Sequence, residues 1–142
     1  MLRCLVLLTL TFAKRVTLHL EQLSPRTQLL HAGISFHDES RCMRFDFRPF
    51  CVDDTYLTAT NLKDAFYSPH LAQSVAWGVT DRSWEEIVSY EHSHLCRRYV
   101  LGVYDCRHYT HEFALWSTGS GTPIWQLHEL WQNHEKHLQL RK

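Results

Sequence analysis

Three stretches in the first third of the chain alternate apolar and polar residues, the pattern of β-strands with one buried face. The stretch 15–23 alternates Val16, Leu18 and Leu20 with polar residues. The same alternation runs through residues 28–36 and 42–47, and the polar residues 37–40 between them predict a hairpin.

The hairpin can be aligned from the sequence alone. An alignment that keeps its apolar face continuous places Asp46 directly opposite His31 on the polar face. A slip by two residues would place Arg44 or Arg48 opposite His31 instead. Side chains on one face of adjacent strands interact when they lie opposite each other, so the polar face holds a histidine with a charged neighbour.

Helix signals occur in the second half of the chain. Ser83 and Glu86 form a capping box, which predicts a helix from there to about Arg98. Asp105 is a good N-cap residue for a second helix, and Thr122 with Pro123 begins a third. The second helix carries an apolar stripe at spacings of three and four, made of Cys106, Tyr109, Phe113 and Trp116. The segment 51–78 is predicted as a loop with a short helix around residues 62–67.

Composition limits the class of protein. The chain has 142 residues, of which 44% are hydrophobic and 13% aromatic, so we expect a packed globule rather than a disordered chain. We expect residues 15–142 to form a single domain, preceded by a leader at 1–14. The formal net charge is zero and no long basic run occurs, which argues against nucleic acid as a partner.

The N-terminal segment has two interpretations. Arg3 followed by about ten apolar or small residues resembles a short signal peptide, and the alternative is a plain leader into the first strand. The segment is shorter than the roughly 20 residues that span a bilayer, and no transmembrane segment is expected elsewhere. The five cysteines are an odd number without CxxC spacing, which favours free thiols in a reducing compartment. We therefore expect a cytoplasmic protein, or a secreted one if residues 1–13 are a signal peptide.

Cys106 is the candidate nucleophile. It follows the N-cap of a helix, where unpaired backbone N–H groups and the helix dipole stabilise a thiolate. His31 on its strand would take the proton, and Asp46 would hold the imidazole in its useful tautomer. The structural alternatives are a small buried cysteine, a strand histidine hydrogen-bonded within the sheet, and a surface ion pair of Asp46 with Arg44 or Arg48.

Histidines and aromatic residues are the candidates for metal and substrate binding. The eleven histidines include three close pairs, but they have neither zinc-finger spacing nor an HExxH motif, so we expect no metal and no cofactor. The five tryptophans are typical of a core, and the alternative is a groove for an apolar or peptide substrate. Tyr109, His108 and Trp77 are the candidate substrate-binding residues.

The histidine strand and the cysteine helix together resemble a known fold. The stretch His31-Ala32-Gly33-Ile34, followed later by Asp105-Cys106-Arg107-His108-Tyr109, resembles the circularly permuted papain-like folds. Within these it is similar to the lecithin:retinol acyltransferase-like proteins, whose motif reads N-C-E-H-F, and to the PPPDE (DeSI-type) isopeptidases. The segment 121–125 also looks like the one that follows the nucleophile helix in the PPPDE group. Asp105 stands where these families have asparagine, and the third polar residue would be Asp46 or Arg44.

The resemblance implies an α+β fold in which a small antiparallel sheet packs against the helix that bears Cys106. It implies a hydrolase or acyltransferase that attacks an ester or (iso)peptide carbonyl and forms an acyl-enzyme on Cys106, with His31 as base. The substrate would be a protein, a peptide or an acyl lipid. Two alternatives remain: a non-catalytic binding module that keeps the fold, and a structural protein whose aromatic surface joins an assembly. The sequence does not indicate an oligomeric state.

Overall fold

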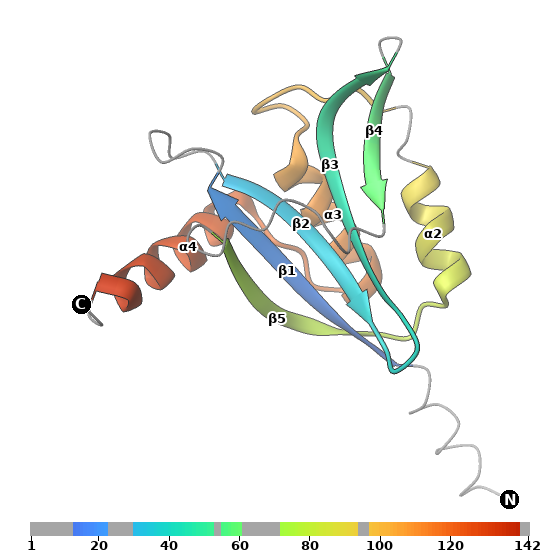
Figure 1. Ribbon diagram of the computed structural model, residues 1–142, viewed down its shortest axis with the longest axis horizontal. Coiled ribbons are helices and arrows are strands. Elements are labelled where there is room, and N and C mark those ends of the chain that lie inside the picture. The colour runs from blue at the N-terminus through green and yellow to red at the C-terminus, as the bar shows by residue number, and fades with distance from the viewer. Residues whose placement is uncertain (1–12, 23–29, 53–54, 61–71, 94–96, 140–142) are drawn as a thin grey trace, which may run out of the picture.

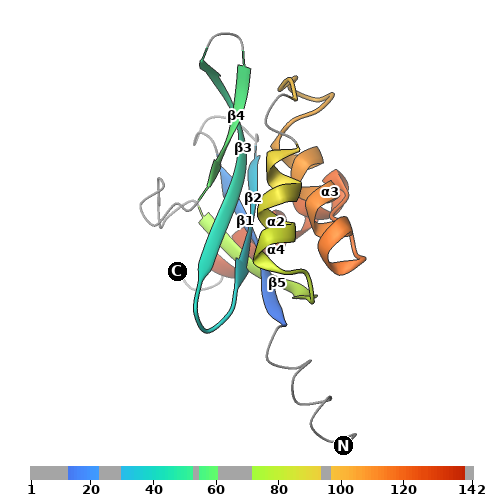
Figure 2. The ribbon, with the colours of Figure 1, turned by 90° about the vertical axis from the view of Figure 1, so that its right-hand side faces the viewer.

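The protein folds as an antiparallel sheet with helices packed on one of its faces (Figures 1 and 2). The structure, a computed structural model, describes residues 13–22, 30–52, 55–60, 72–93 and 97–139. The strands are β1 (Lys14–Gln22), β2 (Leu30–His37), β3 (Cys42–Val52), β4 (Thr55–Thr60) and β5 (Ala72–Thr80). The helices are α2 (Trp84–His92), α3 (Cys106–Thr118) and α4 (Ile124–Gln139). The predicted α+β class is therefore confirmed.

The five strands run in the order β4-β3-β2-β1-β5, and every neighbouring pair is antiparallel. β2 lies at the centre of the sheet, with Ile34 paired to Leu18 on one side and to Phe45 on the other. These three side chains are completely buried. Because alternate residues of a strand point to opposite faces, the residues between them, including His31 and Asp46, lie on the other face.

α3 covers the apolar face of the sheet and contacts β1, β2, β3 and β5. Its Phe113 ring packs against Phe36 and Phe45, with ring centroids 5.0 and 5.3 Å apart. Burying an aromatic side chain of this size contributes roughly 2–3 kcal/mol, so this cluster is the main attachment of α3 to the sheet. Gly119, at φ +78°, ends the helix in the left-handed conformation that glycine adopts without strain.

Two predictions about secondary structure need correction. The segment 51–78 was predicted as a loop, but it contains β4 and β5, which form the two edges of the sheet. Their alternation is weak, and pairing with β3 and β1 decides their conformation. The predicted short helix at 62–67 lies outside the described residues.

The second correction concerns α2, which ends at His92 rather than near Arg98. Beyond it, Arg97 leaves the helix path, since its guanidinium stacks 3.7 Å from the Tyr104 ring centroid and pairs with Glu112 of α3. Trp125 also departs from the predicted core role, because it is 66% exposed.

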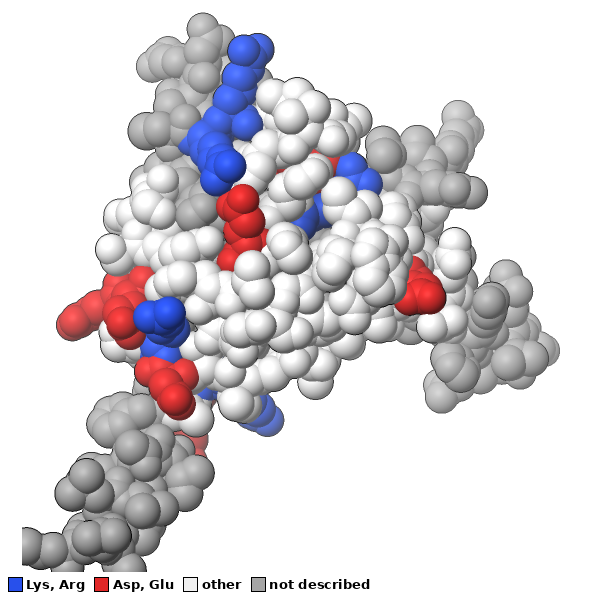
Figure 3. Space-filling view, turned by 180° about the vertical axis from the view of Figure 1, so that it is seen from behind, with Lys and Arg blue, Asp and Glu red and all other residues white. Residues whose placement is uncertain are grey.

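The described helices include none that is both long enough and apolar enough to cross a lipid bilayer. On the helix-bearing side, most of the described surface is uncharged, and acidic and basic side chains are scattered across it (Figure 3). Residues 1–12 of the predicted leader lie outside the described residues, and β1 begins at Lys14.

Candidate functional site

The start of α3 is held by its N-cap residue, as the sequence predicts. Asp105 accepts a hydrogen bond from the backbone N–H of Arg107 at 2.9 Å, and its own N–H donates to His108 Nδ1 at 3.1 Å, completing a capping box. Gly102, at φ +80°, turns the chain just before the cap and donates its N–H to the Asp105 carboxylate at 2.9 Å. This network fixes the position of the first helical residue, Cys106.

The charge of Asp105 is neutralised locally. Its carboxylate pairs with the Arg107 guanidinium at 2.6 Å. Burial by itself raises the pKa of Asp105, but the hydrogen bonds from Arg107 and Gly102 outweigh it and hold the pKa well below its ordinary value. The carboxylate next to the thiol is therefore already compensated by Arg107, which lessens its opposition to a negative charge on the sulfur.

The Cys106 side chain is only 2% exposed and lies against the beginning of β2. Its Sγ atom is 3.8 Å from the backbone carbonyl oxygen of Leu30 and 4.0 Å from the hydroxyl of Tyr99. Tyr99 also interacts with the backbone of Cys106, and burial together with the Cys106 charge raises the pKa of its phenol. The tyrosine therefore stays protonated and donates its O–H toward the sulfur.

His31 follows Leu30 directly and links the sulfur to the sheet. Its Nε2 atom lies 2.7 Å from Oδ1 of Asp46, and the Cys106 side chain lies near enough to raise the pKa of the ring. Burial alone lowers the pKa of His31, but the hydrogen bonds with Asp46 and Cys106 and their charges raise it to about 9. The imidazole is therefore held as a cation between an acid and a thiol.

Asp46 is completely buried, and Arg44 neutralises it by bonding to both carboxylate oxygens, including Oδ1, which His31 also contacts. The guanidinium Nε donates to Asp46 Oδ2 at 2.9 Å, and its Nη2 donates to Glu21 at 2.6 Å. Burial raises the pKa of Asp46, but the hydrogen bond with His31 and the charge of Arg44 lower it to about 2. Of the two candidates for the third polar residue, Asp46 contacts the histidine and Arg44 holds Asp46.

The register of the β2–β3 hairpin differs by two residues from the predicted one. Asp46 lies opposite Gly33, not opposite His31. The ion pair still forms because Gly33 has no side chain: a Cβ atom there would collide with Oδ1 of Asp46. The carboxylate occupies that space and reaches His31 diagonally, two positions along β2.

The three predicted substrate-binding residues have structural partners. Tyr109 is completely buried and stacks on Phe47, with ring centroids 5.3 Å apart, so we propose no substrate contact for it. His108 belongs to the capping box, and the indole N–H of Trp77 donates to the carbonyl of Ser120 at 2.8 Å. Two residues that sequence reasoning missed contribute to the site instead, Tyr99 and Glu21, whereas the pairing of Arg44 with Asp46 was one of the alternatives considered from the sequence. No spacing links Tyr99 or Glu21 to Cys106, so the sequence contains no signal for them.

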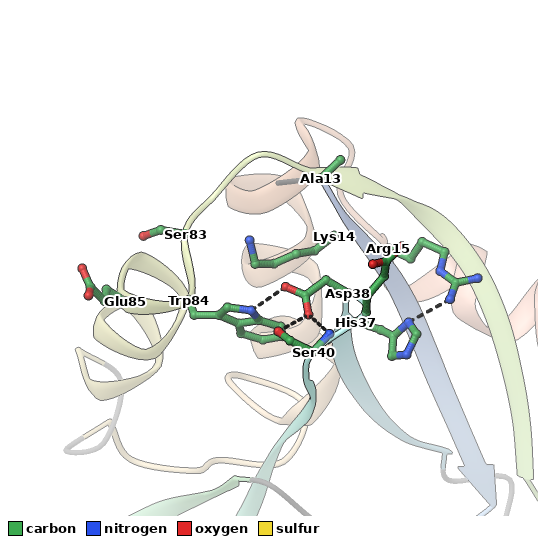
Figure 4. A pocket seen from close by; sticks show the side chains of 10 residues that line it. Ala13, Lys14, Arg15, His37, Asp38, Ser40, Ser83, Trp84 and Glu85 are labelled. Atoms are coloured by element: carbon green, nitrogen blue, oxygen red, sulfur yellow. Dashed lines mark hydrogen bonds between the residues drawn. The ribbon is translucent and has the colours of Figure 1, made fainter. Parts of the chain in front are cut away.

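No cluster of three His, Cys, Asp or Glu side chains able to hold a metal ion occurs among the described residues. A hollow of about 820 Å³ lies at the end of β2 remote from His31 (Figure 4). Within it the Trp84 indole donates to Asp38 at 2.7 Å, and the Lys14 ammonium lies 5.3 Å from the Trp84 ring centroid. This hollow does not include the thiol site.

The comparisons with known proteins give no relative. No protein-family model, no curated protein and no solved structure matches the chain. The function must therefore be argued from the site itself.

Proposed function

We propose that the protein is a cysteine-nucleophile hydrolase or acyltransferase that acts on an ester or (iso)peptide carbonyl. Cys106 is the nucleophile, His31 the general base and acid, and Asp46 the residue that orients the imidazole. The observation that carries the proposal is a buried imidazole that bonds to the Asp46 carboxylate and lies near enough to the Cys106 thiol for the sulfur to raise its pKa. A nucleophile, a base in contact with it and a third group that orients the base are the general requirement for this chemistry.

The proposed reaction starts from a thiolate on Cys106 and an imidazolium on His31. The sulfur attacks the carbonyl carbon, and the carbonyl π electrons move to the oxygen. When the tetrahedral intermediate collapses, the bond to the alcohol or amine breaks and the leaving group takes the proton from His31. Water or another acceptor then attacks the thioester, gives its proton to His31 and releases the acyl product with the thiolate restored.

The backbone N–H of Cys106 is the proposed donor to the developing oxyanion. It belongs to the first turn of α3, where backbone N–H groups have no intrahelical acceptor. The Tyr99 hydroxyl lies against both this residue's backbone and its sulfur. In the proposed mechanism the substrate carbonyl replaces that hydroxyl, and Tyr99 covers the sulfur when no substrate is present.

We also propose that the domain is a circularly permuted papain-like fold, similar to the acyltransferase-like and PPPDE groups. The support is the order of the parts: a histidine on a central strand precedes a cysteine at the start of a helix that packs on that strand. Either an acyl lipid or an (iso)peptide fits this chemistry.

Competition between two thiols tests the proposal. Cys42 is exposed and Cys106 is buried, so accessibility alone predicts that iodoacetamide labels Cys42 first. An activated nucleophile predicts the opposite order near neutral pH, read by peptide mass spectrometry. His31→Ala should remove the advantage of Cys106 and leave the rate of Cys42 unchanged. Faster labelling of Cys42 in the wild type would contradict the proposal.

The second candidate is a binding module that has kept the fold without its chemistry. The near-complete burial of the Cys106 side chain is the observation that favours it. In that case Cys106→Ser should fold with unchanged stability, and iodoacetamide should label Cys106 only under conditions that unfold the domain.

A further inference from the structure

The face of the sheet that points away from α3 carries a pocket of about 650 Å³. Strands β1, β2 and β5 form most of it, and its lining includes Arg15, Thr17, His19, Ser35, His37 and Ala76. Cys106, His31 and Asp46 do not line it. The volume lies within the range of small-molecule sites in proteins, roughly 300–1,000 Å³.

The lining of this pocket carries a positive charge and no negative one. Arg15 is its only Lys, Arg, Asp or Glu residue. The guanidinium donates to Nδ1 of His37 at 2.8 Å, a bond drawn in Figure 4, which fixes its direction and uses one of its five N–H groups. Among the described residues no carboxylate forms an ion pair with Arg15. The pocket therefore presents a positive charge with hydrogen-bond donors to spare.

A second polar group lies in the same pocket. The His19 ring bridges two serines, with Nε2 2.8 Å from the hydroxyl of Ser35 and Nδ1 3.1 Å from the hydroxyl of Ser74. Burial and the charge of Arg44 lower the pKa of His19 to about 4, so the ring is neutral at pH 7.

A neutral imidazole carries a single N–H, so one serine donates to the ring and the other accepts from it. The accepting serine keeps its own O–H for another acceptor. In the tautomer that donates to Ser35, which lines the pocket, this O–H is a neutral hydrogen-bond donor in addition to the Arg15 guanidinium, and exposed Ala76 and Val79 supply an apolar margin.

We infer that this pocket binds a small organic anion, whose carboxylate or phosphate group is held by Arg15 and by the Ser35–His19 pair. Guanidinium groups bind both oxyanions through paired N–H donors, so the two ligand classes share one recognition chemistry. The site is independent of the thiol site described above and goes beyond the proposed function.

Titration followed by ¹H–¹⁵N NMR tests the inference, with inorganic phosphate and benzoate as separate probes. At least one probe should cause saturable shifts centred on the amides of Arg15, His19 and Ser35. Tighter binding of phosphate would identify a phosphate ester as the ligand class, and tighter binding of benzoate a carboxylate.

Three variants make the test specific. Arg15→Gln should weaken binding at least tenfold. Arg82→Gln is the matched control, because Arg82 is also exposed but lies over Trp116, outside this pocket, and it should bind like the wild type. Cys106→Ala should also bind normally, which separates this site from the thiol site. Equal loss in the Arg15 and Arg82 variants, or shifts that never saturate with either probe, would overturn the inference.

Discussion

The carboxylate of Asp46 fills the space where Gly33, directly opposite it on β2, has no side chain. This close approach lets the carboxylate pass over β2 and bond to His31. The geometry of the candidate site thus depends on the smallest residue as much as on the charged ones.

Gly33→Ala should therefore disrupt the site. The added methyl group would collide with the buried Asp46 carboxylate and approach Arg44 at 3.3 Å, so we expect a loss of about 1–3 kcal/mol in the free energy of unfolding. Urea denaturation measures it. Gly78→Ala is the control, because a methyl group there meets only Thr118 at an ordinary 3.5 Å. Similar losses in both variants would show that the space at Gly33 has no special role.

The His31–Asp46 pair should make stability depend on pH. The pKa of His31 is about 9 in the folded protein against 6.5 ordinarily, so its stabilisation is complete below pH 6.5 and is lost as the pH rises through 9. We expect the free energy of unfolding to fall by up to roughly 3 kcal/mol across that window. Asp46, whose pKa is lowered to about 2, makes stability depend on pH in the acidic range. Its stabilisation is present above pH 4 and disappears as the pH falls through 2.

Urea denaturation at pH 6 and pH 9.5 measures the histidine contribution. The variant His31→Gln has no titrating ring, so its stability should change much less between these two pH values. An equally steep decrease in that variant would assign the pH dependence to other groups.

Arg44→Gln should destabilise the protein more than Glu21→Gln. Removing the arginine takes the guanidinium away from the buried Asp46 carboxylate, whereas removing Glu21 leaves the Arg44–Asp46 pair in place. Breaking a buried ion pair costs on the order of 3 kcal/mol, and loss of a partly exposed partner costs less. Thermal unfolding of both variants at pH 7 shows which substitution lowers the melting temperature more. A larger decrease for Glu21→Gln would contradict this arrangement.

Asp105→Asn tests how the cap affects the thiol. Asparagine is also a good N-cap residue, so the helix should remain stable to within about 1 kcal/mol. The substitution leaves Arg107 without its carboxylate partner, and the freed positive charge next to Cys106 should increase the rate of alkylation at neutral pH several-fold. Mass spectrometry of iodoacetamide-treated protein compares this rate with that of Cys42, which serves as the internal control. An unchanged rate would show that the cap charge does not influence the sulfur.

The sequence predicted those parts of the fold that have strong local signals. The alternation in β1 to β3 and the caps of α2, α3 and α4 were sufficient to place these elements. β4 and β5 could not be found, because their residues alternate weakly and neighbouring strands determine their structure. α2 was predicted too long, because its end depends on tertiary contacts of Arg97.

The candidate site was predicted in part. The sequence paired His31 with Asp46, but through direct opposition rather than the diagonal contact that Gly33 permits. Hydrophobic alternation repeats every two residues, so it cannot distinguish two registers that differ by two. Tyr99 could not be foreseen, since its contact with Cys106 depends on the turn that ends at Tyr104.

Leu30 and His31 are consecutive, and one offers its backbone and the other its ring to the same sulfur atom. If β2 paired one residue out of step during folding, its two faces would be exchanged and His31 would no longer lie on the face that carries Asp46. Misaligned chains would then carry an unactivated thiol. The reactivity of Cys106 would therefore measure the fraction of molecules in which the central strand is correctly paired.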